Sequence, residues 1–362
     1  MFIKKILSLS LYLISGVSCL TVSAQSYIPK DNDFVLDSWQ VNSNKSNQTS
    51  ASLTDIENLL EQAQYPGKSA YNVGRANALL KPHLKQDVSG KAWYLSARIL
   101  QHQHQFQAAL KDLDKSISKN KSLTSAWLLK ANIHLALAQY SQARSACVSL
   151  LGQADMLTVA SCSLEVESYQ NKLKASYQQL TELVERYGLP DDESQVWILQ
   201  ILADMAHRLG QNKTAITWLE QYSEQLKPMS LLVLWSDIQL ENNNAEAVDK
   251  QLSEVVNHAE FKDDALLLRL AIAEKQMNTG TYWAEQTLAR IQLRIQRNDR
   301  FHASEIARFY IDIAPNPSKA LHWAEENWRM TKLAADKKLL EAAVSMQGSA
   351  MLPEPPSGMS AE

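Results

Sequence analysis

The sequence predicts an all-α fold in which antiparallel helix pairs stack into a solenoid, and three observations support this prediction. Residues 92–116, AWYLSARILQHQHQFQAALKDLDKS, and residues 126–150, AWLLKANIHLALAQYSQARSACVSL, carry matching residue types at an offset of 34. Alanines recur in both segments where two helices would cross. Only 10 of the 362 residues are glycine, and such a composition suits helices and offers few tight turns for strands.

The two matched units span residues 90–123 and 124–156. Their corresponding residues are Trp93 and Trp127, Ala97 and Ala131, Phe106 and Tyr140, and Ala109 and Ala143. Small side chains at a helix crossing let the axes approach to the usual 8–10 Å, and the aromatic side chains fill the wider space beside it. This order at a 34-residue period resembles the tetratricopeptide repeat. The resemblance implies a right-handed superhelix in which each hairpin buries its apolar face on a neighbour.

Weaker helix pairs precede and follow these two units, so we expect the solenoid to cover residues 53–348. Upstream, residues 54–84 are typical of a helix, a Pro-Gly break and a second helix. Downstream, two further units begin near Leu157 and Val196. The period then slips, but helix–turn–helix patterns continue at residues 230–256, 263–295 and 302–328.

The first 24 residues are predicted to form a secretory signal peptide. A basic start with Lys4 and Lys5 precedes an apolar stretch and the small-residue site Val22-Ser23-Ala24. The apolar stretch is too short for a membrane span, which needs about 20 residues. We therefore expect cleavage near Ala24 and a periplasmic or secreted protein with no membrane span. The alternative is a lipoprotein acylated at Cys19.

The flanking segments and the net charge limit the kinds of partner. Residues 25–52 are rich in Ser, Asn and Gln, residues 349–362 are rich in Pro, and we expect both segments to be disordered. Removal of Lys4 and Lys5 changes the formal charge from −3 to −5. That balance argues against nucleic acid as the main partner.

Both ends of the mature chain resemble a group of exported bacterial tetratricopeptide proteins. The front segment YIPKDNDFVLDSW and the back segment FYIDIAPNPSKALHWAEENWRMTKLAADKKLLEAA carry the similarity. The matching residues are Pro29, Asp31, Asp33, Val35, Leu36, Asn327, Trp328, Asp336, Leu339, Leu340, Ala342 and Ala343. The resemblance implies a helical solenoid in the cell envelope and attaches no enzymatic activity to it.

The resemblance also implies a binding surface, because tetratricopeptide arrays bind through a concave face formed by the first helix of each pair. Carried over, it predicts the partner-binding residues Lys91, Tyr94, Arg98, Gln101, Asn132, Glu165, Tyr169, Trp197, Gln200, Asp204 and His207. Aromatics, amides and both charge signs suit a peptide or protein segment. Arg98 and Asn132 partly resemble a clamp for a C-terminal carboxylate, but Tyr94 stands where that clamp has Lys. For each residue the alternative is a solvated side chain.

Other patterns carry weaker indications of chemistry. His102 and His104 are two residues apart, a spacing that can chelate a metal in an extended turn, although a polar turn is the favoured interpretation. Gly67-Lys68-Ser69 lacks the earlier glycine and the preceding strand of a phosphate loop. Four arginines fall at roughly helical spacing, namely Arg290, Arg294, Arg297 and Arg300. They suggest either an anionic partner or a solvated helix edge, and the solvated edge is the favoured interpretation.

Cys147 and Cys162 are the two thiols that remain after signal removal. They lie at similar distances on either side of a turn expected near residue 154, so antiparallel packing would bring them level. In an oxidising compartment a disulfide is possible; the alternative is two buried thiols.

The sequence as a whole predicts a non-enzymatic scaffold of the bacterial cell envelope, with no cofactor and no metal. It would bind a peptide or protein segment of another envelope protein on the concave face and assist assembly or regulation. An alternative from another class is a periplasmic enzyme or a carrier of metal or small molecules, for which His102, His104 and His207 are the candidate ligands.

Overall fold

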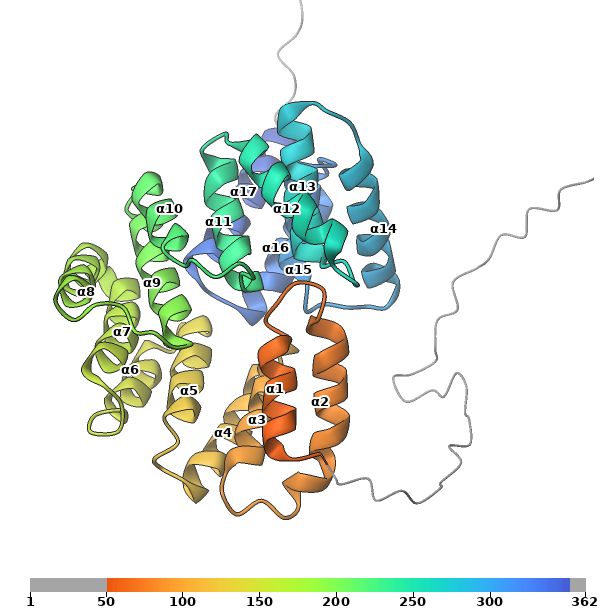
Figure 1. The fold of residues 1–362 in the computed structure, drawn as a ribbon. Coiled ribbons are helices and arrows are strands. Elements are labelled where there is room, and N and C mark those ends of the chain that lie inside the picture. The colour runs from red at the N-terminus through yellow and green to blue at the C-terminus, as the bar shows by residue number, and fades with distance from the viewer. Residues whose placement is uncertain (1–50, 352–362) are drawn as a thin grey trace, which may run out of the picture. The chain divides into compact units, whose positions relative to one another are not determined.

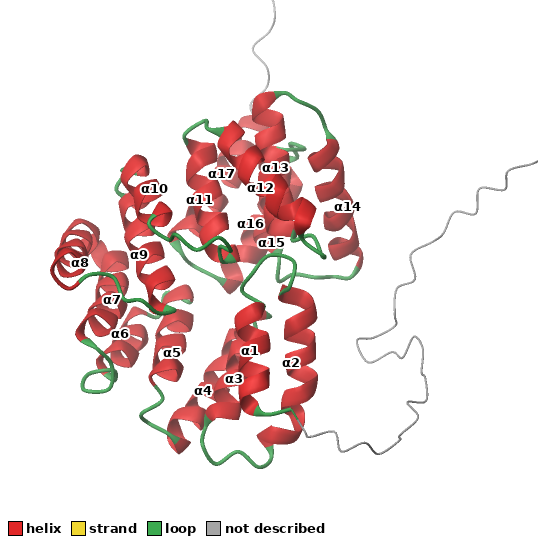
Figure 2. Cartoon of the chain, in the orientation of Figure 1, coloured by secondary structure: helices red, strands yellow, loops and turns green. Residues whose placement is uncertain are grey.

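A computed structural model describes residues 51–351, with side chains described through residue 348. Helices and loops make up this part of the chain, and it contains no strand (Figure 2). The helices are α1 Leu53–Gln62, α2 Ser69–Leu84, α3 Lys91–His102, α4 Phe106–Lys119, α5 Thr124–Ala136, α6 Tyr140–Val148, α7 Met156–Glu167, α8 Leu173–Tyr187, α9 Ser194–Arg208, α10 Asn212–Glu220, α11 Met229–Glu241, α12 Ala245–His258, α13 Asp264–Met277, α14 Tyr282–Gln296, α15 Ala303–Asp312, α16 Pro317–Met330 and α17 Ala334–Met351. The predicted signal peptide and nearly all of the two predicted disordered segments lie outside the described residues.

Consecutive helices pack as pairs, from α1 with α2 to α15 with α16, and α17 packs on α15 and α16 (Figure 1). The first helices of neighbouring pairs also contact each other, from α3 with α5 through to α13 with α15. The predicted all-α array of helix pairs is therefore confirmed. Between residues 51 and 351, no helix combines the length and apolarity needed to cross a bilayer.

The predicted crossing alanines lie in the core. Ala97, Ala109 and Ala143 are fully buried, and Ala131 is almost so. Leu95 and Leu113 are also fully buried, Leu95 against the first hairpin and Leu113 in the cluster that contains Ala97 and Ala109. The apolar residues of the matched units recur at helical spacing, which places them on one face of each helix, against the partner helix. They do not alternate every second residue, as they would in a strand.

Local signals set several helix ends. Ser52 and Asp55 form a reciprocal capping box at the start of α1. Gly90 adopts a left-handed conformation before α3, where a Cβ atom would lie 2.5 Å from the carbonyl oxygen of Ser116. Ser116 in turn donates its hydroxyl to the Gly90 carbonyl oxygen at 2.8 Å. A residue without Cβ is therefore required where this turn packs directly on α4.

The first hairpin contacts helices far along the chain. In the turn between α1 and α2, the Gln64 carbonyl accepts from the Met229 N–H at 2.8 Å. The Gly67 N–H donates to Asp263 Oδ2 at 2.6 Å. The Gly-Lys-Ser motif thus contributes a structural contact between the first pair and the loop before α13.

Candidate functional site

The candidate site is the surface of the four helices α3, α5, α7 and α9, which we call the first-helix face. These helices contact one another in sequence and carry ten of the eleven side chains predicted to bind a partner; the eleventh, Tyr169, lies just past the end of α7. The structure brings four of the side chains on this face together at the α7–α9 end. They are Glu165, Tyr169, Asp204 and Arg208.

Arg208 organises this group. Its Nε donates to Asp204 Oδ2 at 2.8 Å, and its Nη2 donates to Ser168 Oγ at 2.6 Å. The guanidinium carbon lies 4.1 Å from the centroid of the Tyr169 ring, within the range of a cation–π contact. Ser168 and Tyr169 belong to the kinked linker Ser168–Lys172, in which Asn171 is left-handed. The kink allows the chain to turn into α8 directly after these two residues.

Two side chains of this group, Glu165 and Tyr169, have pKa values above their ordinary ones. Burial, and then the negative charge of Asp204, raise the pKa of Glu165 to about 8, although Arg208 opposes them. Burial and Asp204 likewise raise the pKa of the Tyr169 hydroxyl well above its ordinary value. Glu165 therefore holds a proton at neutral pH.

The apolar part of the first-helix face is covered by a segment that the sequence analysis missed. Thr331 is extended between α16 and α17, and the Lys332 N–H donates to the Ala136 carbonyl at the end of α5 at 2.8 Å. The Leu333 side chain packs on the core cluster around the Cys147–Cys162 pair. Around that cluster lie Trp127, Leu128, Tyr140, Tyr169 and Trp197.

Asp336 fixes the end of this segment. It accepts from the Leu333 N–H at 2.9 Å and from Asn327 Nδ2 at 2.7 Å. Asn327 and Asp336 are two of the residues that carry the resemblance to exported tetratricopeptide proteins. Their spacing is thus a sequence signal that could have indicated a structured link between α16 and α17.

The remaining predicted residues are not part of this group. Lys91 forms an ion pair with Glu57 of α1 at 2.6 Å, and Tyr94 packs between two core clusters. Arg98 lies 5.9 Å from the Tyr94 ring centroid. Gln101 and Asn132 are exposed, and Gln200 is partly exposed. His207 contacts Asn212 and lies 3.5 Å from Glu241.

The arginines near the end of α14 pair with acidic side chains of other elements. Arg290 and Arg294 both pair with Asp264 of α13, and Arg294 also pairs with Asp299. Arg300 lies 3.7 Å from Glu326 of α16. Arg290 and Arg300 keep 47% and 60% of their side chains exposed, in keeping with a solvated helix edge. Arg294, at 20%, is held by Asp264 and Asp299 instead.

His102 and His104 both lie near His302, whereas the third candidate ligand, His207, lies beside Glu241. His102 Nε2 is 2.6 Å from the Ser69 hydroxyl, and the His104 ring packs near His302, with centroids 6.1 Å apart. Burial lowers the pKa of both His102 and His104. The described residues contain no group of three His, Cys, Asp or Glu side chains that could hold a metal ion.

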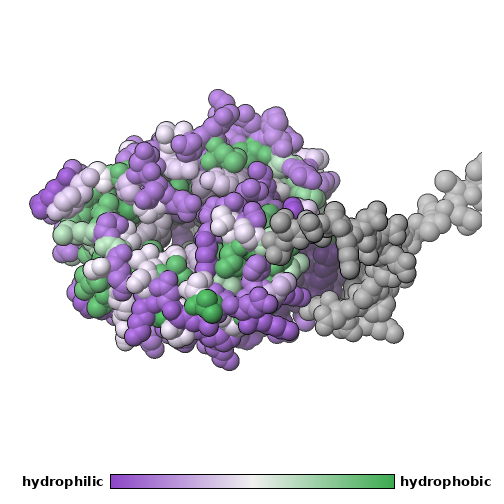
Figure 3. Space-filling view, turned by 60° about the horizontal axis from the view of Figure 1, so that its bottom comes forward, coloured by the Kyte–Doolittle hydropathy of each residue, from purple (hydrophilic) through white to green (hydrophobic). Residues whose placement is uncertain are grey.

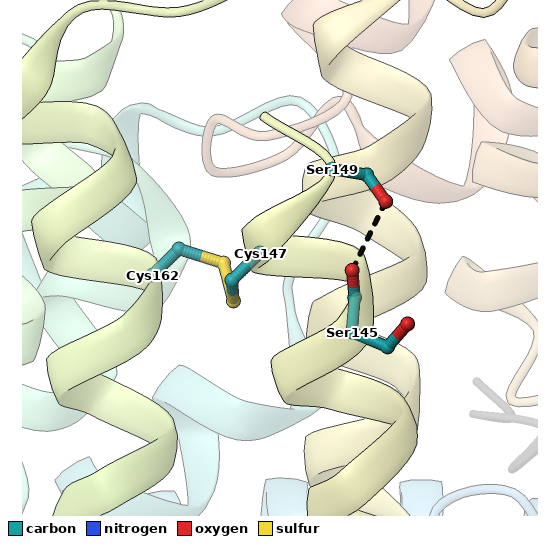
Figure 4. Close-up of a disulfide and its surroundings, with 4 residues drawn as sticks. All are labelled: Ser145, Cys147, Ser149 and Cys162. Carbon is teal, nitrogen blue, oxygen red and sulfur yellow. Dashed lines mark hydrogen bonds between the residues drawn. A yellow bond between two sulfur atoms is a disulfide. The ribbon is translucent and has the colours of Figure 1, made fainter. Parts of the chain in front are cut away.

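Cys147 of α6 and Cys162 of α7 are joined by a disulfide, with Cα atoms 5.6 Å apart (Figure 4). Both residues are buried, and the bond closes a loop of 15 residues. It links the two helices inside the core cluster on which Leu333 packs. On the side of the molecule shown in Figure 3, hydrophobic side chains form small separate groups among hydrophilic ones.

Comparisons with known proteins find similar structures and no similar sequence family. No protein-family model matches the chain, and no curated protein matches it. A tetratricopeptide repeat protein from Parabacteroides merdae is 11% identical with a TM-score of 0.41, covering 71% of this chain and 99% of that one. The APC/C hetero-tetramer Cut9–Hcn1 is 13% identical with a TM-score of 0.47, covering 83% and 57%. The C-terminal part of a TPR repeat-containing protein from Cytophaga hutchinsonii is 14% identical with a TM-score of 0.35, covering 69% and 98%.

Proposed function

We propose that this protein is a non-enzymatic protein–protein interaction scaffold of the bacterial cell envelope, and that its first-helix face binds an extended segment of another envelope protein. The envelope location is supported by the signal-like residues 1–24 and by a cysteine pair suited to an oxidising compartment. Assistance in assembly or regulation of the partner is the role that we assign to this binding.

One observation carries the proposal: the seating of residues 331–333 on the first-helix face. This segment uses a backbone hydrogen bond to Ala136 and a leucine that packs on the buried apolar cluster around Cys147 and Cys162. Grooves that recognise extended peptides use the same two kinds of contact, since main-chain bonds give affinity and side-chain contacts give specificity. A partner segment with a large aliphatic residue would therefore find matching chemistry here.

Capture from an envelope extract with the tagged mature protein tests the proposal. Asn132 is exposed on α5, one turn before Ala136, so Asn132→Arg should obstruct the face without disturbing the core. Gln107→Arg, on the exposed side of the second helix α4, is the matched control. We expect wild type and Gln107→Arg to capture the partner protein, and Asn132→Arg not to capture it. Equal capture by all three proteins would contradict the proposed face.

A further inference from the structure

The first two helix pairs meet the later part of the array through turns and loops. Between residues 51 and 351, helices α1 to α4 have their main helix contacts with one another and with α5. Two turns reach further along the chain: the Gln64 carbonyl accepts from the Met229 N–H at 2.8 Å, and the ring of His104 lies 6.1 Å from the ring of His302. Because loops rather than packed helices form this joint, we expect it to open at a lower free-energy cost than the core of the array.

His302, in the loop before α15, is placed so that its proton decides its hydrogen-bond partner. Its Nδ1 lies 2.5 Å from Arg294 Nη1 and 3.0 Å from Asp299 Oδ2. A guanidinium only donates and an ionised carboxylate only accepts. A neutral ring with a free Nδ1 therefore accepts from Arg294, whereas a protonated ring donates to Asp299 and meets the guanidinium as a like charge.

Asp299 stays ionised as His302 gains or loses its proton. Burial raises the pKa of Asp299, but the hydrogen bond and charge of His302, together with the charge of Arg294, outweigh burial. The net pKa of Asp299 lies well below its ordinary value. The charge that changes in this loop in the mildly acidic range is therefore that of the imidazole.

His104 supplies the second ring, from the turn between α3 and α4. Its φ is +54°, a left-handed conformation that histidine and asparagine adopt more readily than most residues. Burial, and then the charge of His302, lower the pKa of His104 although nearby carboxyl groups oppose them. The titratable groups that act on His104 are His302, Glu305, Asp299, Asp336 and, from its own turn, His102.

We propose that His104 and His302 form a pH-sensitive latch, which holds the first two helix pairs against the loop before α15 when the rings are neutral and releases them when both are protonated. Two unit charges 6.1 Å apart repel each other enough, even in water, to change an equilibrium about threefold. Since closure lowers the pKa of His104, the open joint binds its proton more tightly. The closed joint is therefore favoured above the ordinary histidine pKa of 6.5 and loses stability as the pH falls below it. The latch belongs to the fold and is independent of which partner the first-helix face binds.

Hydrogen exchange at the Met229 amide, followed by NMR on the full mature protein at pH 5 and pH 8, measures the opening. This N–H has its hydrogen bond across the joint, and neither bonded group titrates. His104→Asn removes one ring and keeps a residue that accepts the left-handed conformation, so it should fold. His302→Gln removes the other ring. His322→Asn is the matched control, because this histidine is exposed on α16 and its ring contacts Trp323.

Each exchange rate is divided by the intrinsic rate of the unfolded chain at the same pH, which gives the protection of the amide. Protection at Met229 is then compared with that at Leu199, a fully buried residue of α9, because global unfolding would lower both. We expect the ratio in wild type to fall by at least about threefold from pH 8 to pH 5, and His322→Asn to follow wild type. His104→Asn and His302→Gln should remove most of this change. A ratio independent of pH in wild type, or an equal fall in His104→Asn, would overturn the inference.

Discussion

Replacement of Glu165 by Gln should remove a large part of the pH dependence of folding. The pKa of this carboxyl is raised from an ordinary 4.5 to about 8 in the folded protein, so the folded state binds the proton more tightly than the unfolded state. Stability is therefore highest below pH 4.5 with respect to this group and falls as the pH rises toward 8. Each pH unit in that window costs about 1.4 kcal/mol, which amounts to about 3 kcal/mol at pH 7 and about 4 kcal/mol at pH 8.

These magnitudes are upper values, because the side chain is partly exposed and solvent relieves part of the burial cost. Urea unfolding of wild type and Glu165→Gln at pH 5, 7 and 8.5 measures the effect as a difference between the two proteins. We expect Glu165→Gln to be the more stable protein at pH 8.5 by about 2–5 kcal/mol, with Glu167→Gln following the wild-type profile. Parallel pH profiles for wild type and Glu165→Gln would refute the reasoning.

Three further changes test other parts of the structure. Asp237→Asn leaves Arg269 and Arg308 without their shared carboxylate and should cost about 3 kcal/mol in chemical unfolding. Asp114→Asn, which breaks only an exposed pair with Lys130, should cost under about 1 kcal/mol, and similar losses in both variants would contradict this account. Reduction of the Cys147–Cys162 disulfide, which closes a 15-residue loop, should lower the unfolding free energy by about 3 kcal/mol. The Cys147→Ser/Cys162→Ser variant should not respond to reductant, and a wild-type melting temperature indifferent to reductant would refute the prediction. Gly67→Ala should lower the melting temperature, because Gly67 is left-handed and a Cβ would lie 2.9 Å from that of Ala259. Gly74→Ala in α2, where a Cβ meets nothing within 4 Å, should raise the unfolding free energy by about 1 kcal/mol. If Gly74→Ala destabilised the protein as much as Gly67→Ala, the contact of residue 67 with Ala259 would be unimportant.

The helix pairs could be predicted because their signals are local in the sequence. Trp93 and Trp127, which are 34 residues apart, lie on the first helices α3 and α5. Ala97 and Ala109, the two crossing alanines of the first unit, are both buried in the core. Even where the period slips, the alternation of apolar helix faces and polar turns predicts ranges that α11 to α16 match to within two residues. Helical periodicity depends on residues three and four apart, so it survives the loss of a strict repeat.

The chemistry of the face could be predicted only in part. Glu165 and Asp204 could be predicted because the repeat pattern places them on first helices, which are α7 and α9, and Tyr169 lies just past the end of α7. The contacts that give them their character join distant residues, such as Arg208 with Ser168 across 40 positions and Lys332 with Ala136. No local pattern encodes such pairs, and a leucine between two helices, such as Leu333, is indistinguishable in sequence from an exposed linker residue.

The covering of the first-helix face by residues 331–333 gives the most direct test of the central claim, that this face binds an extended segment. The measurement is the fluorescence anisotropy of a labelled peptide with the sequence of residues 329–337, RMTKLAADK, titrated with wild type and with Leu333→Asp. Leu333→Asp should vacate the face, because an ionised carboxylate is not tolerated against the buried apolar cluster around Cys147 and Cys162, on which Leu333 packs.

We predict that the peptide binds Leu333→Asp at least about tenfold more tightly than wild type, where the chain's own leucine competes for the same contacts. A peptide carrying Asp in place of its leucine should bind neither protein. Equal affinity of the peptide for the two proteins, or no binding to Leu333→Asp, would contradict the account.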